Sequence, residues 1–174
     1  NVKAEEKNVA FESLMTITQP KRWDVDSPYI YKVYSRLKNK KEEVLDCVVN
    51  PLGIREYRFD AEKGFFLNGK YRKLIGTSRH QDYKGMGNAL RDEMHIRDVQ
   101  LSKDMGSNFL RVAHYPQDPV VMQMCDKLGL LTSVEIPVVN AIAQSKAFMD
   151  NCVEQVTEMV YQNYNYPSVI IWAY

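Results

Sequence analysis

The chain has 174 residues, of which 26% are charged and 45% hydrophobic, and its formal net charge is +1. This composition is typical of a globular protein with one domain, or with one small domain and part of another. The near-neutral charge and the lack of a basic stripe disfavour nucleic acid and anionic membranes as partners. No apolar run approaches the roughly 18 residues of a membrane span. No signal-peptide pattern is recognisable either, which leaves the compartment open between periplasmic or secreted and cytoplasmic.

The cysteines and histidines do not form a recognisable metal or disulfide pattern. Three cysteines at wide spacing disfavour a disulfide framework and a zinc cluster. Cys125 and Cys152 lie in apolar helical patterns, where we expect them to pack. The histidines, His80, His95 and His114, lack the spacing of metal ligands, and His95 is expected on a helix away from the strand ends. We therefore expect neither a metal site nor a cofactor.

The first third of the chain alternates in short runs that predict strands of an antiparallel sheet, separated by prolines and a glycine. The predicted strands are Val9–Ile17, Tyr29–Leu37, Glu43–Val49 and Ile54–Phe59. Such a pattern is typical of part of a β-sandwich, to which we assign residues 1–62. The next segment, Phe65–Tyr71, contains Asn68-Gly69 between two hydrophobic arms, which predicts a hairpin with a type I′ turn.

Residues 63–174 alternate regularly between strands and helices. We predict strands over 72–77, 108–113, 130–136 and 169–174, and helices over 90–105, 120–128 and 149–163. Apolar strands separated by helices predict a parallel sheet covered by the helices. An open doubly wound sheet and half of an eight-stranded barrel both fit. Gly85-Met86-Gly87 lacks the third glycine of a dinucleotide fingerprint and does not follow a strand directly, which disfavours a nucleotide site.

The helix predicted over 90–105 carries an apolar stripe at a period of about 3.6 residues. Leu90, Met94, Leu101 and Met105 share this stripe, whereas Val99 lies off it. The stripe predicts the apolar face of that helix.

Ionisable side chains follow three of the predicted strands at their carboxyl ends. His80 and Asp82 follow the first strand, Arg111 and His114 end the second, and Glu135 ends the third. In a parallel α/β fold these ends converge on one pocket. A single Arg or Glu at a strand end is often an internal ion pair, but such residues at all three ends are harder to explain in that way. Donors beside a carboxylate acceptor suit a polyhydroxylated ligand such as a sugar.

At these residues the sequence resembles glycoside hydrolase family 2, the family of β-galactosidases and β-glucuronidases. The matching segments follow one another in the family's order: Phe65–Lys70, Arg79–Asp82, Asn108–Pro116, Cys125–Gly129, Val134–Glu135 and Asn165–Trp172. Upstream, Trp23–Tyr31 and Gly53–Arg55 resemble the immunoglobulin-like domain that precedes the family's barrel. The resemblance covers residues 23–174 and favours the barrel over the doubly wound sheet.

The resemblance implies an α/β fold: the first half of a (β/α)8 TIM barrel, preceded by part of an immunoglobulin-like β-sandwich. The implied chemistry is hydrolysis of terminal β-glycosides by double displacement, as in a β-galactosidase. The residues implied to contact the carbohydrate are His80, Asp82, Arg111, His114, Glu135 and Trp172. The run Ile136–Asn140 lacks the carboxylate and histidine that hold magnesium in some galactosidases, so no magnesium site of that type is expected.

The catalytic carboxylates are expected outside the 174 residues. In the family, the acid/base glutamate follows an asparagine shortly after the tryptophan that Trp172 matches, whereas Ala173 and Tyr174 follow here. We therefore expect a fragment that is inactive by itself. Its open sheet edges would need the missing barrel half or a second copy as cover. The alternative from another class is a stand-alone carbohydrate-binding or interaction protein built on a half-barrel.

Overall fold

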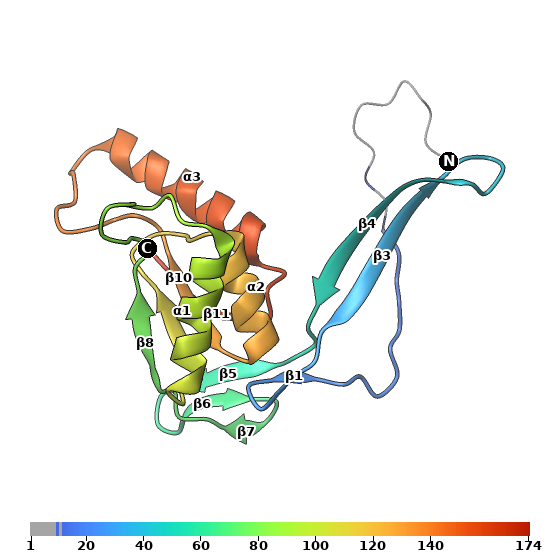
Figure 1. Cartoon of the computed structure of the whole chain (residues 1–174), viewed down its shortest axis with the longest axis horizontal. Coiled ribbons are helices and arrows are strands. Elements are labelled where there is room, and N and C mark those ends of the chain that lie inside the picture. The colour runs from blue at the N-terminus through green and yellow to red at the C-terminus, as the bar shows by residue number, and fades with distance from the viewer. Residues whose placement is uncertain (1–9, 11) are drawn as a thin grey trace.

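The computed structural model describes residues 10 and 12–174, which form a parallel sheet with helices and an antiparallel part that precedes it (Figure 1). The parallel sheet has the order β11-β10-β9-β8, so that neighbours in the sheet are also neighbours in the chain. Its strands are β8 (Gly76–Arg79), β9 (Phe109–Val112), β10 (Leu131–Glu135) and β11 (Val169–Ala173). In a doubly wound sheet the strand order reverses, whereas a barrel keeps chain order. The structure is that of a partial barrel, as predicted.

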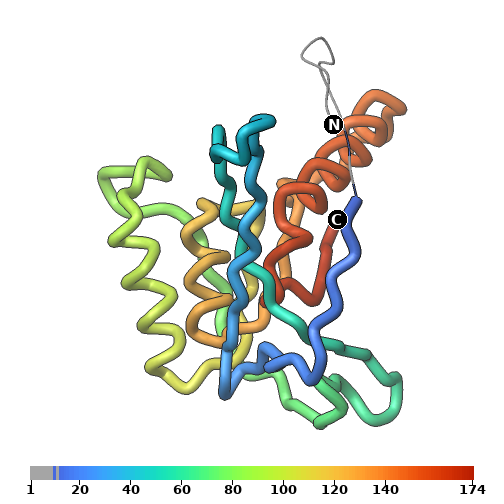
Figure 2. Tube along the Cα trace, turned by 90° about the vertical axis from the view of Figure 1, so that its right-hand side faces the viewer, coloured from blue at the N-terminus to red at the C-terminus, as the bar shows by residue number. Residues whose placement is uncertain are grey.

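Three helices connect these strands and stand side by side (Figure 2). They are α1 (Asp92–Asp104), α2 (Pro119–Leu128) and α3 (Lys146–Asn163). Helix α2 begins after Asp118, whose Oδ1 accepts a hydrogen bond of 2.9 Å from the Val120 N–H, and ends at Gly129 with a φ of 71°. These caps satisfy free backbone groups and so fix the ends of the helix. Among the described residues, no helix has both the length and the hydropathy needed to cross a membrane.

The antiparallel part consists of paired short strands. These are β1 (Trp23–Asp24) with β2 (Ser27–Pro28), β3 (Tyr31–Lys38) with β4 (Val44–Leu52), and β5 (Tyr57–Asp60) with β6 (Gly64–Leu67), which also pairs with β7 (Lys70–Tyr71). The β3–β4 hairpin projects away from the sheet and helices (Figure 1). The predicted turn between β6 and β7 is confirmed, because Asn68 and Gly69 have φ values of 51° and 80°.

Two strand predictions differ most from the structure, and the strand predicted over Ile54–Phe59 is found at Tyr57–Asp60. Residues 10 and 12–17 form no strand, and residues 9 and 11 of the predicted strand Val9–Ile17 lie outside the described part. Leu14 is 96% exposed; apolar residues alone do not form a strand without a partner strand beside them. The first strand of the parallel sheet begins at Gly76 and not at residue 72. At Gly76 the backbone comes close to the neighbouring strand. A Cβ on Gly76 would lie 1.7 Å from the carbonyl oxygen of Phe109.

Alternate residues of the parallel strands pack against the helices in two apolar clusters. One cluster contains Val99, Leu110, Val121, Cys125 and Leu130. The other contains Val112, Met122, Val134, Ile136, Met159 and Val169, and Cys152 packs against it. The predicted packing of both helical cysteines is therefore confirmed.

The predicted apolar stripe of α1 is wrong. The buried residues of this helix are His95 and Val99, whereas Leu101 is 49% and Met105 73% exposed. Val99 packs into the cluster around Leu110, and His95 meets a buried arginine at the end of β8. A polar contact thus helps to determine which face of α1 is buried, and a pattern of apolar residues does not indicate such a contact.

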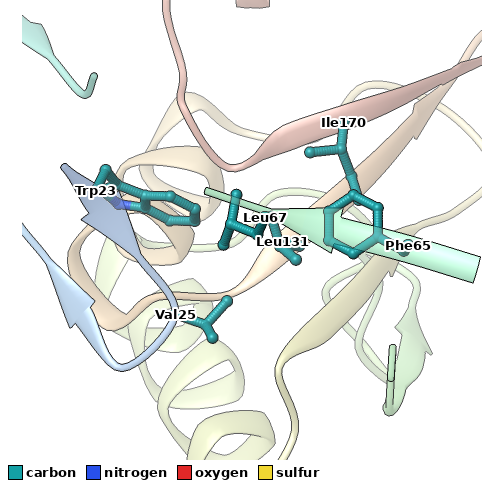
Figure 3. Packing of buried hydrophobic residues seen from close by; sticks show 6 residues of the cluster. All are labelled: Trp23, Val25, Phe65, Leu67, Leu131 and Ile170. Atoms are coloured by element: carbon teal, nitrogen blue, oxygen red, sulfur yellow. The ribbon is translucent and has the colours of Figure 1, made fainter. Parts of the chain in front are cut away.

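A third cluster closes the amino-terminal end of the parallel sheet and includes residues of the antiparallel part (Figure 3): Trp23, Val25, Phe65, Leu67, Leu131 and Ile170. The indole N–H of Trp23 donates to the carbonyl of Asp126 over 2.8 Å, and its backbone N–H donates to the carbonyl of Ile54 over 2.8 Å. A Cβ on Gly129 would lie 2.4 Å from the carbonyl oxygen of Val25, so this close backbone contact requires glycine.

The same end holds a buried carboxyl group, that of Asp126 on α2. Burial raises its pKa to about 7, against the opposing effects of hydrogen bonding to Ser168 and of the charge of Arg55. Oδ1 of Asp126 accepts a hydrogen bond of 2.9 Å from the Ser168 N–H. Arg55 in turn donates to the carbonyls of Pro167 and Val169, both over 2.7 Å. As the pH rises, the carboxyl group of Asp126 therefore loses its proton at a higher pH in the folded chain than in the unfolded chain.

Replacing this carboxyl by an amide tests its effect on stability. Because the folded pKa of Asp126 lies above its unfolded value of 3.8, the wild-type chain loses stability as the pH rises from about 4 to about 7. Asp126→Asn keeps an acceptor for Ser168 but does not titrate. The variant should therefore gain stability relative to wild type, on the order of 2–4 kcal/mol by pH 8.

Urea unfolding at several pH values measures this difference. The matched control is Asp150→Asn, since Asp150 is an exposed carboxylate paired with Lys146 on α3, and it should show little change over the same range. A stability difference between Asp126→Asn and wild type that stays constant from pH 5 to pH 8 would contradict the assignment.

Candidate functional site

Arg111 and Glu135 form an ion pair on the face of the sheet that the helices do not cover. Leu110 and Val112 pack against the helices, so Arg111 between them points to the opposite face. Its guanidinium donates from Nε to Oε1 of Glu135 and from Nη2 to Oε2, the latter over 3.0 Å. This two-point contact fixes the orientation of both groups.

The two strand-end histidines lie beside this pair. Nδ1 of His114 is 3.3 Å from Nη2 of Arg111 and 3.5 Å from Oε2 of Glu135. The rings of His80 and His114 meet edge to face with their centroids 4.8 Å apart. His80 follows β8 and His114 follows β9 closely, so residues from three consecutive strand ends are brought together.

The pair holds opposite charges in a partly open site. The hydrogen bond from Arg111 lowers the pKa of Glu135 below its ordinary value, against the effect of burial, which raises it. Conversely, Glu135 raises the pKa of Arg111. The Arg111 side chain is 47% exposed and that of Glu135 12%. Glu135 is therefore an ionised hydrogen-bond acceptor at neutral pH, beside donors that can reach a ligand.

Two other predicted contact residues lie elsewhere. Asp82 is exposed in the segment after β8 and makes no hydrogen bond or ion pair within the part of the chain that the structure describes. Trp172 packs against the helix-side cluster that contains Val134, with which it is in register. Its ring therefore lies on the other side of the sheet from the Arg111–Glu135 pair.

A second polar network lies behind the histidines, on the helix side of β8. Arg79 is only 7% exposed. Its Nη2 is 2.8 Å from Oδ2 of Asp98 and 3.0 Å from Nδ1 of His95, and Nη1 donates to Oε1 of Gln117 over 2.6 Å. Burial lowers the pKa of His95, and the charge of Arg79 lowers it further. A neutral imidazole with Nδ1 as acceptor follows from this.

The prediction that His95 lies away from the strand ends is wrong, because His95 contacts Arg79, the last residue of β8. A usable signal was present. His95 and Asp98 lie about one turn apart on one helix, so that their side chains share a face. Such a polar face opposite a strand-end arginine predicts a buried ion pair. Within the described residues, no group of three or more His, Cys, Asp or Glu side chains is arranged to hold a metal ion.

The chain matches two models of one protein family. The model described as "Glycosyl hydrolases family 2, TIM barrel domain" matches residues 60–174, and that described as "Glycosyl hydrolases family 2" matches residues 1–55.

Individual relatives agree with these matches. A β-glucuronidase of Bacteroides fragilis is 40% identical over 167 residues, which are 91% of this chain and 24% of the relative. A β-galactosidase of Bacteroides ovatus is 31% identical over 172 residues, covering 96% of this chain and 20% of the relative. The crystal structure of a Bacteroides uniformis β-glucuronidase is 46% identical with a TM-score of 0.85, over 90% of this chain and 19% of that one. The chain thus spans about a fifth to a quarter of the length of these relatives.

Removing the guanidinium tests the electrostatics of the pair. In Arg111→Met, the pKa of Glu135 should rise, because burial, which raises it, is then no longer opposed by Arg111. A carboxyl-detected NMR titration measures this pKa directly. Because the pKa of Glu135 is lower in the folded wild type than in the unfolded chain, where it is about 4.3, ionised Glu135 stabilises the fold above that pH. As the pH falls below about 4.3, the wild type should therefore lose more stability than the variant.

The matched control is Arg58→Met, which removes an exposed arginine paired with Asp60 in another part of the chain. It should leave the titration of Glu135 unchanged. An identical Glu135 pKa in wild type and Arg111→Met would show that the ion pair does not form in solution.

Proposed function

Because the chain belongs to glycosyl hydrolase family 2, we propose that it is part of an enzyme that hydrolyses terminal β-glycosides. The observation that carries this proposal is the cluster of Arg111, His114 and Glu135 at the carboxyl ends of β9 and β10. In TIM barrels the chemistry takes place at this end of the strands. The cluster offers fixed donors and an ionised acceptor, which sugar hydroxyl groups can satisfy.

Each residue of the cluster has its own role in this proposal. His80 and His114 donate hydrogen bonds to sugar hydroxyls from the edge of the pocket. Glu135, kept ionised by Arg111, accepts a hydrogen bond from a hydroxyl group and does not itself react. Asp82 is exposed beside His80 and can contact an extended ligand. Trp172 supports the fourth strand from the helix side, and we do not place it against the sugar.

The reaction proposed for the family member is double displacement with retention. Two carboxyl groups about 5–5.5 Å apart flank the scissile bond; one attacks the anomeric carbon, and the other protonates the leaving oxygen and then activates water. The family resemblance puts the acid/base glutamate after an asparagine downstream of Trp172, and only Ala173 and Tyr174 follow Trp172 in these 174 residues. We therefore propose that the residues of this chain bind and orient the sugar without supplying the reacting carboxylates.

Two sugar classes are candidates for the substrate. The sequence-based expectation of a β-galactosidase is supported by the relative of that name from Bacteroides ovatus. The identity to proteins named β-glucuronidase is higher, which favours a β-glucuronide. The two differ at C6, where a glucuronide carries a carboxylate and a galactoside a hydroxymethyl group.

The 174-residue chain alone should show no turnover of nitrophenyl β-glucuronide or nitrophenyl β-galactoside above the buffer rate, because in this proposal its residues do not supply the reacting carboxylates. We still expect the 174-residue chain to bind sugar through the side chains of the cluster. Titration with glucuronate and with galactose, followed by NMR, should shift the signals of His80 and His114, and the sugar with the larger response identifies the class. Glu135→Gln, which is uncharged, should weaken that response.

Hydrolysis by the isolated chain would overturn the assignment of the reacting groups. A complete lack of response of His80 and His114 to both sugars, at concentrations up to their solubility, would overturn the sugar-binding role itself.

We further propose that the outer edges of β8 and β11 are covered by more strands of the barrel or by a second copy of the chain. Both strands end the sheet in its described order, and unpaired edges associate readily. Sedimentation velocity of the 174-residue chain over a dilution series should show association that increases with concentration. A single monomeric species at every concentration would contradict this proposal.

A further inference from the structure

Gln117 joins the ends of β8 and β9 through its side chain. Its Nε2 donates to the carbonyl oxygen of Arg79 over 2.6 Å and to that of Ala113 over 3.0 Å. Its Oε1 accepts from Nη1 of Arg79 over 2.6 Å. Both amide protons and the amide oxygen are therefore used, which also fixes which way the amide group points.

The two carbonyls that Gln117 holds directly precede the two histidines of the site. Arg79 precedes His80 and Ala113 precedes His114. The strand ladder itself continues to this point, since the Ala113 N–H donates to the carbonyl of Arg79 over 3.1 Å. Beyond this bond, the backbones of the two strands have no further ladder contact to fix their separation. The side chain of Gln117 adds the last connection before the chain segments that carry the imidazoles.

We propose that Gln117 is a positioning residue that sets the spacing of the His80 and His114 rings, an inference that rests on the sugar-binding role proposed above. A binding site needs its groups held within about 0.5 Å of the productive geometry by residues whose own rotamers are locked. The rings of His80 and His114 contact each other with centroids 4.8 Å apart. Nδ1 of His114 also contacts the Arg111–Glu135 pair, so a shift of either backbone would change the whole sugar-facing surface.

The helix layer anchors this connection. Arg79, which donates to Gln117, is itself held by Asp98 and by the neutral imidazole of His95, both on α1. Tyr83 donates to the other carboxylate oxygen of Asp98 over 2.6 Å. Gln117 thus links Arg79, which is buried and fully paired, to the backbone directly before each of the two histidines. The network behind the site therefore supports the geometry in front of it.

The decisive variant is Gln117→Glu. A carboxylate keeps the acceptor for Arg79 but removes both donated hydrogen bonds and places negative charge against two carbonyl oxygens. In the 174-residue chain, the wild type should show a nuclear Overhauser effect between ring protons of His80 and His114. Gln117→Glu should lose this effect and shift the imidazole resonances of His114. The resonances of His95 should stay in place, because its contact with Arg79 is retained.

The matched control is Gln100→Glu, the same change on α1 at a residue whose side-chain amide donates to Asp104 one turn away. It should retain the wild-type signals of all three histidines. Retention of the ring-to-ring effect and of the His114 resonances in Gln117→Glu would overturn the proposal.

A measurement on the wild type does not depend on whether the variant folds. The side-chain amide protons of Gln117 should exchange with water more slowly than those of Gln100, because both amide protons of Gln117 are donated to backbone carbonyls. Equal exchange rates would overturn the proposal. Neither experiment requires sugar. A negative result therefore contradicts the positioning role of Gln117 alone, whereas the titration with glucuronate and galactose tests the sugar-binding role separately.

Discussion

The burial of Trp23 at the amino-terminal end of the parallel sheet is the constraint on which the rest of the structure depends. Its ring is fully buried with Leu131 and Ile170 of two parallel strands, and its two N–H groups reach α2 and the segment before β5. Truncating a buried tryptophan to alanine costs about 3–5 kcal/mol. Trp23 and Val25 of the β1–β2 segment and Phe65 and Leu67 of β6 are therefore packed into the barrel end as part of its core. The opposite ends of the same strands carry the polar groups of the candidate site.

Strand β9 shows how the sheet separates stability from chemistry. Leu110 and Val112 are fully buried against the helices, while Arg111 between them meets Glu135 on the other face. The period of two along a strand makes this division unavoidable. On the helix side, a charge is tolerated only where it is fully paired, as Arg79 is with Asp98, His95 and Gln117. Arg79 of β8 and Arg111 of β9 thus lie on opposite faces of the sheet.

The sequence was sufficient to predict the elements of the parallel part and the convergence of three strand ends, because both follow from periodicity and topology. The contacts of His80, Arg111, His114 and Glu135 with one another follow from that convergence. The inward face of α1 was not predictable from apolar residues, since His95 is buried through a hydrogen bond to Arg79. The side of the sheet on which Trp172 lies was not predictable for a related reason. The sheet register between β10 and β11 shifts near Thr132, which no sequence pattern indicates, and register decides which face each residue of a strand occupies.

Two carboxyl groups at opposite ends of the sheet show how differently one fold treats the same chemical group. Asp126 is buried near Trp23, and burial raises its pKa to about 7. Glu135 lies at the open end, where Arg111 lowers its pKa. A group held ionised by a guanidinium is a poor proton donor at neutral pH, because a general acid needs a pKa near the working pH. In the proposed hydrolase, the proton for the leaving group must therefore come from a carboxyl group in a different environment. In that proposal, Glu135 and Arg111 act as a fixed pair of opposite charges that orients the sugar and the groups around it.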